Sequence, residues 1–319
     1  MIFSRPAVGN DRTTPAFCGS AFVLCCFRYG EKTAYYGQGI KRAEDMKKMS
    51  RNAEEILREL QLEGLRVETL DEVTSTNELL LMRGEMGDPE GLILTADLQT
   101  AGRGRRGRSF YSPEDAGIYT SILLRPHLTM QQIGKLTPLA AVAVCETLEE
   151  ISGCPLSIKW VNDVFLSGRK ICGILAQASK TFSDGIPDYV VMGIGINLFP
   201  PKGGLPHEIE NIAGSLWSKP EQVQRFSAEP GIREKIIGRM WKRFYEMYQA
   251  PDDASYVEAY RSRMMMFGKE IIAYGGADGT ERAARLVGLT DDYALMLKYE
   301  GEDKPVAVRT GEIRIRESL

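Results

Sequence analysis

Histidine is scarce in this chain, and the motifs of two common enzyme classes are missing. The sequence contains two histidines, His127 and His207, and neither a His-Glu-x-x-His nor a Cys-x-x-Cys pattern. Because zinc sites are built from histidine and cysteine at such spacings, we do not expect a zinc enzyme or a zinc finger. A Gly-x-Ser-x-Gly elbow is also missing, so the sequence gives no support for a serine hydrolase.

Long apolar runs are missing too, and the cysteines follow no ligand spacing. The longest uncharged apolar run near the start, residues 16–27, is too short to span a bilayer. No small-residue cleavage site follows it, which argues against an export signal. The six cysteines do not form a disulfide framework: Cys18, Cys25, Cys26, Cys145, Cys154 and Cys172. We therefore expect a cytoplasmic protein without a membrane anchor.

The overall charge is slightly acidic. A net charge of -3 argues against a protein whose whole surface binds nucleic acid, so any basic site must be local. A hydrophobic content of 43% is enough to build cores, which excludes disorder throughout. A length of 319 residues suggests two or three domains.

Hydrophobic periodicity divides the chain into three parts. Residues 1–64 are expected to be an N-terminal extension, partly disordered, with one helix within 41–64 and no convincing DNA-binding domain. Residues 65–264 alternate strands with helices, as expected of a catalytic domain. Residues 265–319 change to short alternating runs separated by glycine and aspartate turns, which predicts a small all-β barrel.

Individual elements can be placed within these parts. We expect a helix over residues 133–151, with Pro138 at a kink or at its true start, and a second helix over 231–262. Ser167-Gly168 predicts a tight turn between two strands. The strands expected are 92–98, 118–124, 156–161, 164–166, 170–177, 188–198, 270–274, 285–288, 294–298, 306–309 and 313–315.

The densest functional signal is a basic, glycine-rich stretch at residues 99–108. It holds Arg103, Arg105, Arg106 and Arg108, and no acidic residue occurs between positions 98 and 113. Its Gly-x-Gly-x-x-Gly pattern is not a dinucleotide fingerprint, because the helix and the acidic residue that should follow are both missing. Two functional interpretations remain: a nucleic-acid patch, or an anion clamp over a phosphorylated small molecule. An ordinary solvated loop is the third possibility.

A second cluster combines Lys-Trp-Val-Asn-Asp at residues 159–163 with a lysine at position 170. If Ser167-Gly168 turns a hairpin, Asp163 and Lys170 lie close together on paired strands. An aspartate there can hold Mg²⁺ with ATP phosphates, and a lysine there can pair with a substrate carboxylate. For Lys159 and Trp160, an ordinary sheet face is an equal alternative.

Two polar segments complete the candidate site. Residues 72–77 precede a short helix, so we expect one hydroxyl to cap that helix; the alternative is the polar floor of a pocket. Gly193-Ile-Gly-Ile-Asn197 ends a strand, where glycines admit a ligand close to the backbone. Asn197 can reach a nucleotide from there.

From about residue 66 to the C-terminus, these segments resemble, in order, the biotin protein ligases, also called biotin–[acetyl-CoA-carboxylase] ligases. The arginine-glycine stretch and residues 159–163 at this spacing are highly specific, and Gly311-Glu-Ile near the end adds to the match. Val161 stands where the family usually has proline. The resemblance implies an α+β fold: a mixed β-sheet with flanking helices, a class II synthetase-like catalytic domain over 65–264, and a small SH3-like β barrel over 265–319.

The resemblance also implies residue roles. Lys170 and Arg105 would carry the catalysis, while Asp163 and Asn197 would lie on the ATP side, with Asp163 as a ligand of Mg²⁺. The residues that would contact biotin or its adenylate are Ser75, Thr76, Asn77, Gln99, Arg103, Gly104, Arg105, Lys170 and Gly173.

The implied reaction has two steps. Biotin's carboxylate attacks the α-phosphate of ATP to give biotinyl-5′-AMP and pyrophosphate, and a lysine of a biotin carboxyl carrier protein then takes the biotinyl group. The alternatives are a lipoate or octanoate protein ligase of related fold, and a nucleic-acid-binding protein that uses the arginine-glycine stretch. No membrane and no specific nucleic acid are expected as partners, and a homodimer stays open.

Overall fold

A computed structural model gives the structure of the chain and describes residues 43–180, 182–183, 185–274, 280–309 and 314–317. Residues 47–319 form one compact unit. The expected N-terminal helix is present as α1 (Ala43–Leu60), and its residues Ile56 and Leu60 are buried in the hydrophobic core. Among the described residues, no helix combines the length and apolar character needed to cross a membrane.

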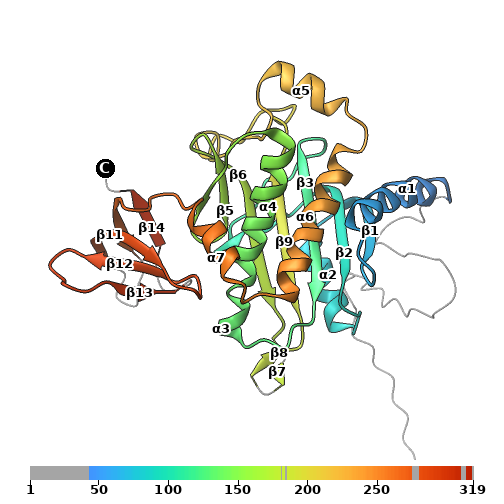
Figure 1. Cartoon of the computed structure of the whole chain (residues 1–319). Coiled ribbons are helices and arrows are strands. Elements are labelled where there is room, and N and C mark those ends of the chain that lie inside the picture. The colour runs from blue at the N-terminus through green and yellow to red at the C-terminus, as the bar shows by residue number, and fades with distance from the viewer. Residues whose placement is uncertain (1–42, 181, 184, 275–279, 310–313, 318–319) are drawn as a thin grey trace, which may run out of the picture. The chain divides into compact units, whose positions relative to one another are not determined.

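A seven-stranded sheet forms the centre of the unit (Figure 1). Its strands, in spatial order, are β1 (Arg66–Val73), β2 (Leu92–Gln99), β3 (Gly117–Leu124), β9 (Val190–Asn197), β6 (Arg169–Ala178), β5 (Asp163–Leu166) and β4 (Ser157–Lys159). Strands β1 and β2 are parallel, whereas every other neighbouring pair is antiparallel. The prediction of a mixed sheet with flanking helices is therefore confirmed.

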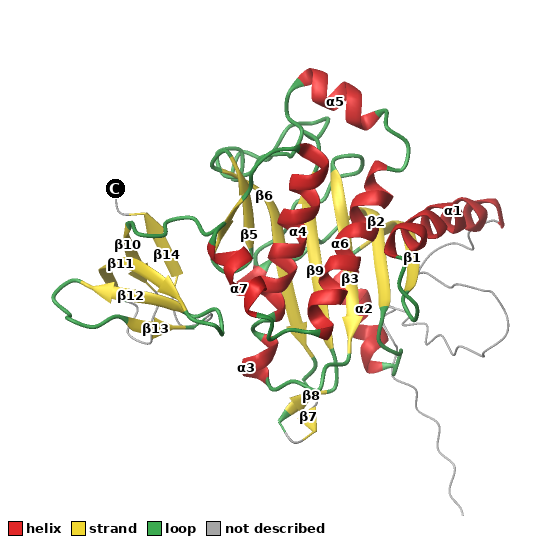
Figure 2. Ribbon diagram, viewed as in Figure 1, coloured by secondary structure: helices red, strands yellow, loops and turns green. Residues whose placement is uncertain are grey.

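Helices cover both faces of this sheet. Helices α4 (Leu136–Ser152) and α6 (Ile232–Gln249) pack against each other and cross the front of the sheet in Figure 2. The opposite face packs against α2 (Thr76–Glu85). Because side chains alternate along a strand, Ile93 of β2 belongs to the α4–α6 core, whereas Leu92 and Leu94 pack with Leu80 of α2.

Two helix predictions need correction at their ends. The stretch 231–262 forms two helices, α6 and α7 (Ala254–Arg261). The Asp253 carboxylate accepts a hydrogen bond from the backbone N–H of Ser255 and so caps α7 as a new helix. Residue 133 belongs to a separate short helix, α3 (Met130–Ile133). Pro138 therefore marks the start of α4 and does not kink it.

The C-terminal part contains a second, five-stranded sheet. Its order is β13-β12-β11-β10-β14, and all neighbouring pairs are antiparallel. The strands are β10 (Glu270–Tyr274), β11 (Glu281–Leu289), β12 (Leu295–Tyr299), β13 (Val306–Val308) and β14 (Arg314–Glu317). Of the strand expected at 313–315, the first residue lies outside the described residues. The remaining elements are the helix α5 (Pro220–Ser227) and the short hairpin of β7 (Phe182–Ser183) and β8 (Ile186–Pro187).

Candidate active site

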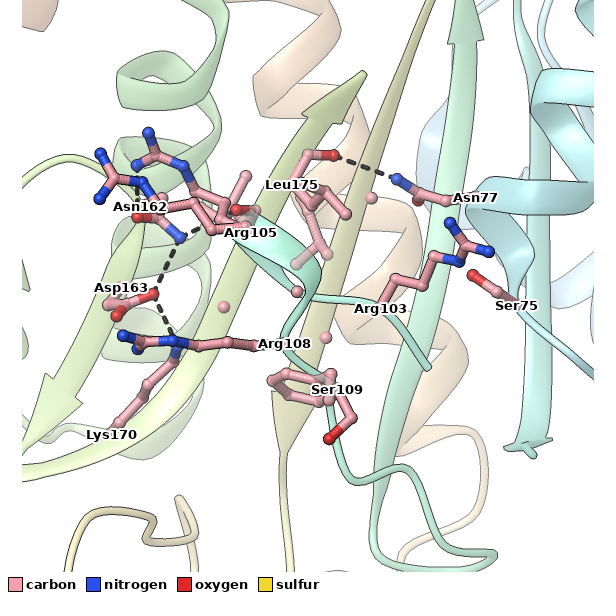
Figure 3. A pocket seen from close by; sticks show the side chains of 18 of the residues that line it. Ser75, Asn77, Arg103, Arg105, Arg108, Ser109, Asn162, Asp163, Lys170 and Leu175 are labelled. Carbon is pink, nitrogen blue, oxygen red and sulfur yellow. Dashed lines mark hydrogen bonds and ion pairs between the residues drawn. The ribbon is translucent and has the colours of Figure 1, made fainter. Parts of the chain in front are cut away.

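The largest group of predicted site residues lines one cavity on the central sheet (Figure 3). The cavity lies between the start of α2, the loop after β2, and the hairpin of β5 and β6. Its lining includes the predicted residues Ser75, Thr76, Asn77, Gln99, Arg103, Gly104, Arg105, Asp163, Lys170 and Gly173. The first and last of these residues, Ser75 and Gly173, are about a hundred positions apart in the sequence, so folding brings them together.

The β5–β6 hairpin places a lysine against an aspartate. Ser167 and Gly168 connect the two strands, both with positive φ (48° and 78°), the conformation of the tight two-residue turns that join antiparallel strands. The turn brings Lys170 Nζ to 2.7 Å from Asp163 Oδ1, so the predicted proximity of these two residues is confirmed. The same oxygen accepts a hydrogen bond from Asn162 Nδ2 at 2.9 Å, which fixes the carboxylate from two sides (Figure 3).

The arginine-glycine loop lies over this hairpin. Arg105 donates from Nη1 to Asn162 Oδ1 at 3.0 Å and so lies on the same side of the cavity as Asp163. Burial, reinforced by the neighbouring Arg106, lowers the pKa of the Arg105 guanidinium, but an arginine stays protonated at neutral pH. Arg103 forms an ion pair with Glu78 of α2 at the other end of the cavity. The loop therefore spans the cavity, with one arginine at each end.

Phe110, at the end of this loop, lies on the floor of the cavity. A Cβ built on Gly195 of β9 would lie 2.5 Å from the Phe110 ring, and one built on Gly173 of β6 would lie 3.2 Å from it. Gly173 and Gly195 are register partners in the sheet, so side chains at either position would displace the ring. We did not identify Phe110 from the sequence; the signal was the pair of glycines on neighbouring strands, which requires something large above them.

The start of α2 is held by a glutamine. The helix begins after Ser75, which makes no side-chain capping hydrogen bond, so the expected cap by this hydroxyl is wrong. Instead, Gln99 Oε1 of β2 accepts from the backbone N–H of Thr76 at 2.9 Å. Gln99 Nε2 donates to Ser112 Oγ at 2.9 Å, just beyond the arginine-glycine loop. A glutamine from a neighbouring strand thus ties α2 to the base of the loop and leaves the Ser75 hydroxyl facing the cavity.

Asn77 is also held by the sheet. Its Nδ2 donates to the backbone carbonyl of Leu175 at 3.3 Å and to Gln177 Oε1 at 2.9 Å. The absence of a side chain at Gly193 is required here, because a Cβ at that position would lie 1.9 Å from Asn77 Oδ1. The glycine of β9 therefore makes room for a polar side chain of the fold.

Asn197 is the one predicted site residue outside the cavity lining. It ends β9, and its Nδ2 donates to the backbone carbonyl of Gly214 at 3.0 Å. That contact anchors the loop after β9. Within the described residues, no three histidine, cysteine, aspartate or glutamate side chains form a group that could hold a metal ion.

The lining also includes residues that were not assigned to the site from the sequence, among them Lys159, Trp160 and Tyr274. Trp160 also donates from Nε1 to the carbonyl of Tyr293 at 2.9 Å, which links the cavity wall to the C-terminal part. Tyr274 ends β10. Its presence could not be predicted, because no local pattern says which strand end of the second sheet reaches the cavity.

The sequence and structure were compared with known proteins. A family model described as the biotin/lipoate A/B protein ligase family matches residues 70–197. The bifunctional ligase/repressor BirA of Salmonella typhimurium is 34% identical over 257 residues, which cover 80% of this chain and 76% of that protein. BirA of Bacillus subtilis is 40% identical over 146 residues, or 46% of this chain and 44% of that protein. In contrast to the Salmonella typhimurium match, the chain thus spans about half the length of curated relatives such as BirA of Bacillus subtilis.

A solved structure matches over a longer range. The biotin protein ligase from Aquifex aeolicus in complex with biotin and ATP has a TM-score of 0.64 and 30% sequence identity. The match covers 79% of this chain and 99% of that chain. It therefore includes both the central sheet and residues beyond those of the family model.

Proposed function

Because this chain belongs to the biotin protein ligase family, we infer that it activates biotin with ATP to biotinyl-5′-AMP and transfers the biotinyl group to a lysine of a biotin carboxyl carrier protein. One observation carries this proposal. A single cavity combines a fixed lysine–aspartate pair, an arginine-rich loop and a polar floor at the start of α2. Such a cavity suits a ligand with a carboxylate at one end and a neutral hydrogen-bonding group at the other.

The first step brings two anions together. Two like unit charges about 4 Å apart repel by about 4 kcal/mol at an effective dielectric constant near 20, which corresponds to a factor of about 10³ in rate. We assign Lys170 as the cation that pairs with the biotin carboxylate, and Arg105 as the cation that pairs with the nucleotide phosphates. The carboxylate oxygen forms a bond to the α-phosphorus, the bond to the bridging oxygen breaks, and pyrophosphate leaves.

The neutral end of biotin has a different environment. Its ureido ring carries one acceptor and two N–H donors, and the Ser75 hydroxyl and the Gln99 amide face the cavity as hydrogen-bonding groups. The apolar chain would lie beside Phe110 and the glycines of β6 and β9. A lipoyl tail has no group that would use this polar floor, so the floor favours biotin over lipoate.

The residues present do not form a site for a resident Mg²⁺ ion. Asp163 is the one carboxylate among the described lining residues, and its Oδ1 is engaged by Lys170 and Asn162. Mg²⁺ is usually held by one or two carboxylates together with substrate phosphates. We therefore assign Mg²⁺ to the nucleotide substrate and derive no step from a metal on Asp163.

In the second step, the acceptor lysine attacks the carbonyl carbon of the mixed anhydride. The carbonyl carbon gains a bond to nitrogen, the bond to the phosphate oxygen breaks, AMP leaves, and the lysine nitrogen loses a proton. We propose Asp163, the one carboxylate among the described lining residues, as the acceptor of that proton. We propose that the C-terminal sheet is SH3-like; it adds Tyr274 to the cavity wall. We also propose that the reaction takes place in the cytoplasm.

Pyrophosphate release tests this proposal directly. The protein is mixed with ATP and Mg²⁺, and with biotin, lipoate, octanoate or no acid. We expect pyrophosphate release in the sample with biotin and in none of the others. A carrier domain is then added, and mass spectrometry should show one biotinyl group on its lysine. Release with lipoate and not with biotin would identify a lipoate ligase, and release with neither would refute ligase activity.

A further inference from the structure

A chain of buried hydroxyl and amide groups extends from the cavity floor into the protein and joins three elements. Thr76 and Asn77 belong to α2, Ser121 to β3 and Gln177 to β6. Thr76, Asn77 and Ser121 are 3%, 4% and 0% exposed. Ser121 is not part of the cavity lining, so a ligand in the cavity does not touch it. Buried polar groups are almost always hydrogen-bonded, and these groups bond to one another.

The direction of hydrogen bonding in this chain is fixed. The backbone carbonyl of Leu175 can only accept, so its contact with Asn77 identifies the nitrogen end of that amide. The other end, Asn77 Oδ1, can only accept, and it receives the hydroxyl proton of Ser121 at 2.6 Å. The Ser121 hydroxyl has a single proton, and it donates that proton to Asn77 Oδ1. The 2.7 Å contact between Ser121 Oγ and Thr76 Oγ1 therefore needs the proton of Thr76.

This direction decides what Gln99 can offer to a ligand. Thr76 Oγ1 lies 3.1 Å from Gln99 Oε1 and 2.7 Å from Ser121 Oγ, and it has one proton for the two contacts. With that proton on Ser121, Gln99 Oε1 accepts from the backbone N–H of Thr76 alone. A carbonyl oxygen has two lone pairs, so the second lone pair of Gln99 stays available to an N–H donor in the cavity.

We propose that Ser121 is a positioning residue for substrate specificity: by taking the Thr76 proton it keeps Gln99 Oε1 open for an N–H of the bound substrate. The proposal rests on the function inferred above, since the ureido ring supplies that N–H. Without the Ser121 hydroxyl, the Thr76 proton turns to Gln99 Oε1 and occupies the open lone pair. The substrate then loses one acceptor although no residue in contact with it has changed.

The test is a double-mutant cycle read through pyrophosphate release. Ser121→Ala should raise the KM for biotin about tenfold, the worth of one hydrogen bond, and leave the KM for ATP and the kcat close to those of the parent. In the Thr76→Val background no hydroxyl can turn to Gln99, so adding Ser121→Ala should change the KM for biotin less than twofold. Thr95→Val, which removes a buried hydroxyl from β2 outside the cavity lining, should leave all three parameters unchanged.

Two outcomes would overturn the proposal. The first is an unchanged KM for biotin in Ser121→Ala. The second is a loss that affects kcat and both KM values alike and persists in the Thr76→Val background, because that is the pattern of a purely structural residue. If the parent enzyme releases no pyrophosphate with biotin, that result would refute the proposed function instead.

A crystal structure of ligand-free Ser121→Ala tests the inference even if biotin is not the substrate. The distance between Thr76 Oγ1 and Gln99 Oε1 should shorten to about 2.8 Å, typical of a hydroxyl donating to a carbonyl. A distance that stays at the present 3.1 Å would contradict the proton rearrangement whatever the substrate of the enzyme.

Discussion

Gly193→Ala is the substitution whose effect can be worked out most directly from the structure. Gly193 lies in β9, between β3 and β6, so its backbone cannot move without breaking hydrogen bonds on both sides. An alanine Cβ would lie 1.9 Å from Asn77 Oδ1 and 2.7 Å from Asn77 Cγ. Since the strand is fixed, the Asn77 side chain has to leave its position.

The magnitude follows from what Asn77 loses. Its amide makes hydrogen bonds with Leu175, Gln177 and Ser121, and each contributes about 1 kcal/mol net to stability. Replacing glycine by alanine restricts the unfolded chain and returns about 0.4–1 kcal/mol, whereas overpacking a filled site costs about 1–3 kcal/mol. We therefore expect the free energy of unfolding to fall by about 3–6 kcal/mol, which corresponds to a Tm lower by roughly 6–24 °C.

Differential scanning calorimetry and urea unfolding measure this effect, with Gly203→Ala as the matched control. A Cβ at Gly203 meets no atom within 4 Å, so this variant should unfold within about 0.5 kcal/mol of the parent. The KM for biotin should rise in Gly193→Ala and stay unchanged in the control. Equal stability of the two variants would show that Asn77 is not held against β9, and the account of the cavity floor would be wrong.

Four further results are expected. Lys170→Ala should lower adenylate formation about 10³-fold while circular dichroism shows an intact fold, and unchanged pyrophosphate release would exclude its role. Arg105→Gly removes the hydrogen bond to Asn162 and adds loop flexibility, so it should still make biotinyl-AMP but release it about ten- to a hundredfold faster; biotin blotting of added albumin detects the escaped anhydride, and labelling no stronger than with the parent would contradict a retaining role. Removing residues 1–40 leaves the buried residues of α1 in place, so soluble protein with near-parental ligase activity is expected, and an insoluble or inactive product would count against this view. Any binding to DNA should be weak and lost at physiological salt, and a nanomolar, sequence-specific complex in a fluorescence anisotropy titration would disprove it.

Local sequence patterns predicted the features that depend on near neighbours. The Ser167-Gly168 turn is visible in two residues, and it alone brings Asp163 and Lys170 together. The basic loop is likewise a local feature, a run of arginines and glycines between two strands. Strand β3 was predictable because all eight of its residues are buried and the segment holds no charged residue. In each case the information lies within about ten residues of the chain.

The features that were missed depend on contacts between distant segments. A hydroxyl cap on α2 was a sound local expectation, but Ser75 makes no side-chain capping hydrogen bond, and Gln99 from another strand satisfies the backbone N–H of Thr76. The ring of Phe110 covers Gly173 and Gly195, which are adjacent only because β6 and β9 pair. Asn197 looked available at a strand end, yet the carbonyl of Gly214 holds its amide. The roles assigned to individual cavity residues from the resemblance stay predictions until the variants above are measured.

The distribution of charge explains how a net acidic chain could bind the two anionic substrates of the proposed reaction. The described lining holds six cationic side chains and one carboxylate, Asp163, whereas the whole chain has a net charge of -3. Asp163 fixes Lys170 in place, and Glu78 does the same for Arg103, so each acid positions a cation at one end of the cavity. The cations of the lining repel one another across the cavity. Anionic substrates remove that repulsion as they bind. We therefore expect the arginine-glycine loop to be most stable over the cavity when both proposed substrates are bound, the state in which water must be excluded.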